Sequence, residues 1–178
     1  MVRKKEMFYL PLVHLSLLNN KFCYKFAEKV RDILKNKQGW SKYGYSFVEL
    51  KSKKNAKLVP SDQVMLLRLV PPSVLYRSYP QFKDEQLSVA NITKKTVDFN
   101  SDRWLGTLPN HSGLPISDYQ TYLVNHEVGH LLGKNHLYVS KLLNKKILAP
   151  IMIQQTKGIG ILKPNFWPTD LDNYQTFF

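Results

Sequence analysis

One stretch constrains the fold more than any other: residues 125–136, which read NHEVGHLLGKNH. It holds three of the five histidines of the chain. His126 and His130 lie four residues apart, a spacing that places two side chains on one face of an α-helix. Gly133 follows His130 closely and can take the left-handed conformation that ends a helix. The stretch therefore predicts a helix that ends near Gly133, where the chain turns sharply.

This arrangement is typical of a metal site that carries its own base. A pair of histidines alone would fit an ordinary helix surface, but a turn at the glycine can bring His136 back to the same ion as His126 and His130. Glu127 is next to the first ligand and can reach a water held by the metal. Three protein ligands and one open position are typical of catalytic zinc. We therefore interpret the three histidines as zinc ligands and Glu127 as a general base.

The rest of the chain predicts a domain of strands and helices. Short apolar runs bounded by turn residues indicate strands, and apolar positions at helical spacing indicate a further helix. The strands are expected at residues 8–18, 45–50, 63–70 and 96–100, and the helix at residues 21–36 after Asn20 as its N-cap. Residues 51–62 and 105–115 read as loops, and residues 76–93 fit no single pattern.

The helix that bears the histidines has its own start signal. Ser117 and Gln120 are spaced as a capping box, which predicts a helix over residues 118–132. The order strand, helix, three strands, helix and irregular tail is typical of an α+β domain, a mixed α/β fold. The 178 residues and their 43% hydrophobic content suffice for one core. We expect a single domain over residues 1–178.

The chain is strongly basic, with 26 lysines and arginines against 13 aspartates and glutamates and a formal net charge of +13. Such a charge attracts polyanions and acidic partners. The basic residues occur in short clusters, and aromatic residues do not alternate with them as in nucleic-acid modules. A solvated lysine-rich surface explains this composition. A basic nucleic-acid-binding protein stays open as an alternative.

Cysteine content and hydropathy bear on the setting of the protein. The single cysteine, Cys23, excludes an internal disulfide and fits the apolar face of the first helix. The basic and apolar start imitates a secretory signal, but Pro11 and His14 interrupt it, which favours a strand. No run approaches the roughly 18 apolar residues that cross a bilayer. The compartment stays open, an intracellular one is slightly favoured, and we expect a monomer. His14 and His111 are expected to be structural or exposed.

Residues 126–136 match the extended motif HExxHxxGxxH, so the sequence resembles the metzincin zinc metallopeptidases. That clan places a methionine in a tight turn beneath the metal, and Met152 in KILAPIMIQQT corresponds to it. The segments FNSDRW, YLVNHEVGHLLG, APIMIQQT and PNFWP further resemble an uncharacterised metzincin-like domain family that is common in actinobacteria. Weaker similarity reaches upstream to Gly39, so most of the chain is covered. The zinc motif is specific to the clan, and the other segments indicate the family.

The resemblance implies a fold and a chemistry. The fold would be a twisted, mostly parallel sheet with a backing helix, an active-site helix and a short C-terminal part that holds the methionine turn. His126, His130 and His136 would bind one catalytic Zn²⁺. Glu127 would take a proton from the water that zinc activates and deliver it to the leaving amine of a peptide. Met152 would form a hydrophobic floor without a bond to zinc.

The implied activity is zinc-dependent hydrolysis of peptide bonds in a peptide or protein substrate. Metzincins commonly bind peptide as an added strand, and residues 96–100 or a neighbouring strand are candidates for that sheet edge. The chain departs from the pattern at Gln154, where some members have tyrosine, and at Leu137, which matches no better-known subgroup. It also lacks the several cysteines and exported appearance of many actinobacterial members. A non-catalytic, zinc-stabilised binding protein is the other alternative, although such a protein needs no base at Glu127.

Overall fold

A five-stranded sheet organises the computed structural model, which describes residues 5–18, 25–138 and 147–173. The strands are β1 (Lys5–Val13), β2 (Tyr45–Glu49), β3 (Val64–Val70), β4 (Val89–Asn91) and β5 (Thr96–Asn100). Their order in the sheet is β2-β1-β3-β5-β4. Neighbouring strands are parallel except β4, which runs antiparallel to β5 at one edge.

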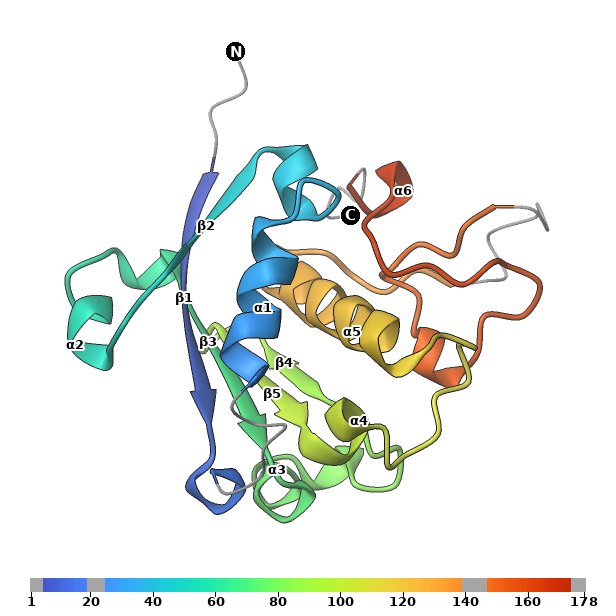
Figure 1. Ribbon diagram of the computed structural model, residues 1–178, viewed down its shortest axis with the longest axis horizontal. Coiled ribbons are helices and arrows are strands. Elements are labelled where there is room, and N and C mark those ends of the chain that lie inside the picture. The colour runs from blue at the N-terminus through green and yellow to red at the C-terminus, as the bar shows by residue number, and fades with distance from the viewer. Residues whose placement is uncertain (1–4, 19–24, 139–146, 174–178) are drawn as a thin grey trace.

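Helices cover mainly one face of this sheet (Figure 1). The described helices are α1 (Phe26–Lys35), α2 (Lys53–Ala56), α3 (Pro72–Ser78), α4 (Ser101–Leu105), α5 (Ile116–Leu131) and α6 (Asp170–Asn173). The long helices α1 and α5 lie together on that face, whereas α2 projects on the opposite side. The expected α+β fold, with a mostly parallel sheet, a backing helix and a histidine-bearing helix, is confirmed.

The core lies between the sheet and the helices α1 and α5. Alternate residues of β3, namely Met65, Leu67 and Leu69, are buried in this core, as a strand with one covered face requires. The apolar stripe expected on the first helix is also buried there, through Phe26 and Val30. Each side chain of this size stabilises the fold by about 1.5–3 kcal/mol when it is fully buried. The sheet and α1 thus form the rigid support for α5.

Helix α5 is enclosed on nearly all sides. Residues 121–129 are all buried, because the sheet covers one face and the segments around Trp40 and Phe166 cover another. The indole Nε1–H of Trp40 donates to the backbone oxygen of Asn125 at 2.9 Å, and the Asn125 side chain donates to the backbone oxygen of Phe166 at 2.9 Å. Within the described part of the chain, no helix is both long and apolar enough to cross a membrane.

The predicted strands agree with the structure except at the N-terminus. β2, β3 and β5 lie within one residue of their expected bounds. The first strand was expected at residues 8–18, but β1 ends at Val13 and a short 3-10 turn follows at Leu15–Leu17. Pro11 lies inside β1, on a stretch where β1 pairs with β3 but β2 has already ended, so no hydrogen bond to β2 is lost.

Several short elements differ from expectation. The expected loop at residues 51–62 contains α2, the ambiguous residues 76–93 contain the end of α3 and β4, and α4 precedes the second loop. Each of these elements is too short for periodicity to identify. The first helix begins at Phe26 rather than at residue 21, and the proposed N-cap Asn20 and Cys23 lie outside the described residues.

The capping box expected at the start of α5 is wrong. The helix begins at Ile116 after Pro115, and no side chain caps it. The hydroxyl of Ser117 instead accepts a hydrogen bond from Lys29 at 2.9 Å, and the Gln120 amide donates to the backbone oxygen of Trp104 at 2.8 Å. Both side chains therefore bond to partners from distant parts of the sequence, and the helix begins two residues earlier than expected.

Candidate metal centre

The end of α5 brings His136 back toward the helix. Gly133 has a φ of 85°, a left-handed conformation that favours glycine. Its N–H donates to the backbone oxygen of His130 at 3.0 Å, and the N–H of Lys134 donates to that of Gly129 at 2.9 Å. These two bonds form a Schellman motif, which ends a helix and reverses the chain. The turn predicted at Gly133 is confirmed.

The three histidines point one nitrogen each at a common point. Nε2 of His136 lies 3.1 Å from Nε2 of His130 and 3.2 Å from Nε2 of His126. Two nitrogens bound to one zinc ion at tetrahedral angles would lie about 3.3 Å apart. Among the described residues, these three side chains are the group whose ligand atoms lie close enough together to hold a metal ion. The predicted ligand set is thus brought together.

Backbone carbonyls fix the orientation of two of the rings. Nδ1–H of His126 donates to the backbone oxygen of Ile151 at 2.5 Å, and Nδ1–H of His130 donates to that of Lys134 at 2.8 Å. With the proton held on Nδ1, the lone pair of Nε2 faces the common point. This division of roles between the two ring nitrogens is usual for histidines that bind metal.

Burial keeps these imidazoles neutral. It is the main cause that lowers the pKa of His126 well below its ordinary value, and the nearby His130 lowers it further. Burial also lowers the pKa of His130, and it lowers the pKa of His136 to about 4. Only the neutral ring has a lone pair to offer to a cation, so at neutral pH the cluster is in the form that binds metal.

The side chain of Glu127 is buried beside this cluster. The residue is 6% exposed, and burial raises the pKa of its carboxyl to about 8. Glu127 lines the same cleft as His126 and His130. A carboxyl with a raised pKa can both accept and return a proton near neutral pH, as a general base requires.

The histidines open into a cleft of about 320 Å³ between α5 and the edge strand β4. β4 contributes Val89 and Ala90 to the wall, and α5 contributes Tyr119 and Leu123 in addition to the site residues. Gln154 also lines the cleft. Residues 96–100, one candidate for the sheet edge, form β5, which is paired on both sides. The edge is the neighbouring strand β4.

Met152 packs directly beneath the helix that carries the site. It is fully buried, and a Cβ atom on Gly129 would lie only 2.5 Å from its Sδ and 2.9 Å from Cζ2 of Trp40. The backbone oxygen of Met152 accepts a hydrogen bond from the N–H of Leu137 at 2.9 Å, next to the third histidine. Met152 thus packs against α5 at Gly129, between the first two histidines, and its role as a floor beneath a metal stays a prediction.

Replacement of Gly129 by alanine is expected to destabilise the protein by about 1–3 kcal/mol through overpacking. At an exposed helix position the same change would stabilise the protein by about 1 kcal/mol. A negative effect on the free energy of unfolding would therefore report the close approach of Met152 to Gly129. Urea denaturation measures the free energy of unfolding. The cost should fall in a Met152→Ala background, where the sulfur is removed. An equal or increased stability of Gly129→Ala would contradict this packing.

The zinc-free protein is expected to lose stability as the pH falls from about 6.5 toward 4. The pKa of His136 is lowered to about 4 in the folded chain. At a pH below the ordinary histidine pKa, the unfolded chain therefore binds more protons than the folded chain. The loss should be about 2 kcal/mol for this residue, allowing for its partial exposure. The measurement compares urea midpoints at pH 7 and pH 4 for the wild type and His136→Gln. Identical pH dependence in the two would contradict the shift.

Some residues of the site carried no sequence-based prediction. Tyr122, one helical turn before His126, donates to the backbone oxygen of Ile153 at 2.9 Å, and helical spacing would have identified it. Arg103 lines the cleft and donates to the backbone oxygens of Gln86, Glu85 and Pro109, so it holds the loops around the site. Asp172 reaches the methionine turn from far along the chain, and no local pattern marks it.

The remaining histidines lie apart from the cluster. Nδ1 of His14 is 2.8 Å from the hydroxyl of Ser16, and His111 is exposed.

Fold and site together define an α+β domain with a three-histidine cluster that is suited to a metal ion. The chain belongs to the family described as protein of unknown function (DUF3152), whose model matches residues 18–168. The comparison with curated proteins finds no match.

Proposed function

We propose that this protein is a zinc-dependent metallopeptidase. One observation carries the proposal: three imidazole Nε2 atoms converge on one point, with Glu127 in the same cleft. Three neutral histidine nitrogens form a donor set that suits zinc, and catalytic zinc sites commonly use three protein ligands. A bound zinc would polarise a peptide carbonyl and lower the pKa of a water molecule.

The residues of the chain would then divide the remaining work. His126, His130 and His136 would hold the ion, and the carbonyls that receive their Nδ1 protons would keep two of the rings in place. Glu127 would accept a proton from the attacking water and deliver it to the nitrogen of the leaving amine. Its buried position supports this role, because a carboxyl out of water holds and releases a proton near neutral pH.

The edge of the sheet offers a place for a peptide. β4 is the outer strand, and its residues Val89 and Ala90 line the cleft beside the histidines. An extended peptide can pair with a free strand edge through backbone hydrogen bonds. A substrate bound along β4 would lie next to the metal and Glu127.

The two alternatives are less well supported. A purely structural zinc site is usually closed by a fourth protein ligand, whereas the cluster among the described residues consists of three histidines that face a cleft. A nucleic-acid-binding protein would account for the net charge of +13 but not for the cluster. If it bound duplex DNA through phosphate contacts, the affinity would fall steeply with salt.

The proposal is tested by metal analysis and a peptide library. The purified protein should contain one zinc ion per chain, and it should cleave members of a mixed peptide library. Cleavage should cease after treatment with a chelator and return when zinc is added, but not when magnesium is added. Well-folded protein that binds no zinc, or cleavage that survives complete metal removal, would overturn the proposal.

Zinc is also expected to stabilise the folded chain. At a free zinc concentration of about 100 times the Kd, a site present only in the folded state contributes about 2.7 kcal/mol. Differential scanning calorimetry of the metal-free protein should show a Tm that rises with zinc concentration. A Tm that does not change with zinc would contradict a preformed site.

A further inference from the structure

Asp172, on the short helix α6, is fully buried and accepts hydrogen bonds from the backbone of the methionine turn. We propose that Asp172 is a positioning residue of the metal centre: through one peptide group it orients His126 and strengthens it as a ligand. This inference rests on the proposed zinc site. It concerns a side chain that lies outside the HExxHxxGxxH motif.

The carboxylate of Asp172 holds the methionine turn by its backbone. Its two oxygens accept hydrogen bonds from the N–H of Ile151 at 3.1 Å and from the N–H of Met152 at 2.8 Å. The N–H and hydroxyl of Thr169 donate to the same carboxylate at 2.7 Å and 2.8 Å. Four donors thus compensate a buried charge, as the interior of a protein requires.

A single peptide group joins this carboxylate to a zinc ligand. The group that links Ile151 to Met152 has its N–H bonded to Asp172 at one end. At the other end its C=O accepts the Nδ1–H of His126 at 2.5 Å. A hydrogen bond to the N–H of a peptide polarises its carbonyl, and such chains strengthen each successive bond. A stronger acceptor at Nδ1 makes the opposite nitrogen more basic and keeps the ring in one orientation.

The same helix also reaches the supports of the other two histidines. The backbone oxygen of Asn173 accepts a hydrogen bond from Nζ of Lys134 at 2.7 Å. The backbone oxygen of Lys134 in turn accepts the Nδ1–H of His130. The backbone oxygen of Met152 holds the N–H of Leu137, beside His136. α6 therefore contacts the structures that place each of the three ligands.

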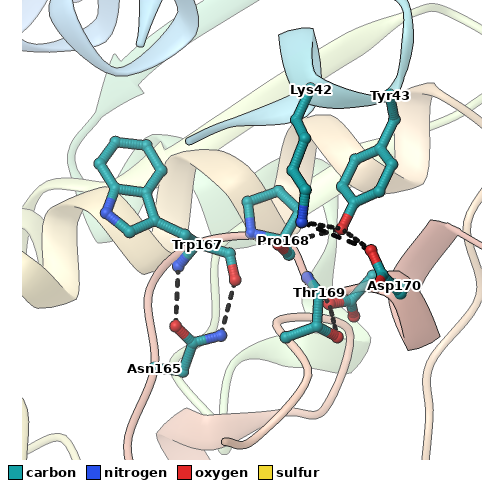
Figure 2. A network of polar contacts seen from close by, with 8 residues as sticks. Lys42, Tyr43, Asn165, Trp167, Pro168, Thr169 and Asp170 are labelled. Carbon is teal, nitrogen blue, oxygen red and sulfur yellow. Dashed lines mark hydrogen bonds and ion pairs between the residues drawn. The ribbon is translucent and has the colours of Figure 1, made fainter. Parts of the chain in front are cut away.

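A second network, at the surface, joins α6 to Tyr43 and Lys42 (Figure 2). The hydroxyl of Tyr43 donates to the carboxylate of Asp170 at 2.8 Å, and Lys42 approaches the same oxygen at 3.4 Å. Just upstream, the side chain of Asn165 bonds the backbone of Trp167 on both sides. The Asp170 contacts lie at the surface, where its side chain is 69% exposed, and they are separate from the hydrogen bonds of Asp172 to the methionine turn.

The two aspartates of α6 provide a matched pair of variants. Asp172→Asn keeps the size of the side chain but presents an amide to one of the N–H donors. Asp170→Asn makes the same charge change two residues away, on a side chain that is 69% exposed and does not touch the turn. Zinc affinity is measured by competition with a chromophoric chelator. Cobalt(II) is also substituted, because its visible absorption reports the geometry and strength of the ligands.

We expect Asp172→Asn to bind zinc about 10–100 times more weakly, the usual effect of removing a partner that supports a metal ligand. Its cobalt spectrum should shift in position or intensity. Asp170→Asn should match the wild type in both measurements. If Asp172→Asn does not fold, Thr169→Val removes one of the four donors to the carboxylate and should weaken zinc binding measurably, by about three- to tenfold.

The outcomes separate this inference from the proposed function. A wild-type chain that is folded but binds no zinc would overturn the metal site itself. A wild type that binds zinc, together with an Asp172→Asn variant of equal affinity and unchanged cobalt spectrum, would overturn only the role of Asp172. Unchanged binding in Thr169→Val would do the same where Asp172→Asn cannot be purified.

Discussion

Replacement of Glu127 by glutamine is expected to lower peptide hydrolysis by about 10²–10⁴-fold, the contribution typical of a general base. Glutamine has nearly the same shape but cannot accept a proton. The side chain is buried and the neutral form of Glu127 is favoured there, so the amide should fit without loss of stability. The initial rate of cleavage of a peptide identified from the library measures the effect.

Zinc content serves as the control for this variant. Glu127 is not one of the three converging residues, so Glu127→Gln should still bind one zinc ion and should retain its Tm. Loss of activity with zinc retained assigns the residue to the chemistry rather than to the metal site. Full activity in a zinc-loaded Glu127→Gln protein would exclude it as the base and require another proton acceptor in the cleft.

Replacement of His126 by alanine is expected to weaken zinc binding by about three orders of magnitude or more. Structural zinc sites bind with about 10–16 kcal/mol, and one of three protein ligands contributes a correspondingly large share. His126 is also the candidate ligand that is hydrogen-bonded to the methionine turn. Hydrolysis should be lost together with the metal, and the stabilisation by zinc should disappear from calorimetric scans.

The chain contains a suitable control for this experiment. His111 is exposed and lies outside the cluster, so His111→Ala removes the same kind of side chain without removing a ligand. Its zinc affinity and activity should equal those of the wild type. If the two variants lost zinc to the same degree, the metal would not be held where the three Nε2 atoms converge.

The part of the site that could be predicted from sequence is the part fixed by local geometry. His126 and His130 share a helix face, and Gly133 returns His136, so a single stretch determines the relation of all three. Asp172 could not be predicted, because its link to the turn depends on how the C-terminal segment packs. The false capping box has the same origin: a tertiary partner occupies Gln120.

The elements of the fold also differ in how well they could be predicted from the sequence. β2, β3 and β5 were predicted to within one residue, whereas β1 was predicted several residues too late, and β4, with three residues, has no periodicity to recognise. Its identity as the edge beside the cleft depends on pairing with β5, which is a long-range property of the sheet. The strand that lines the cleft was therefore the one for which the sequence carried the weakest signal.

The enclosure of α5 also determines where the molecule can move. Local opening is most costly where many buried contacts must break at once, and residues 121–129 are all buried. The first two candidate ligands and Glu127 are consequently attached to one of the least mobile parts of the chain. Any rearrangement that admits a substrate must then take place in the three-residue strand β4 and in the loops around the cleft, while the helix that would carry the chemistry stays still.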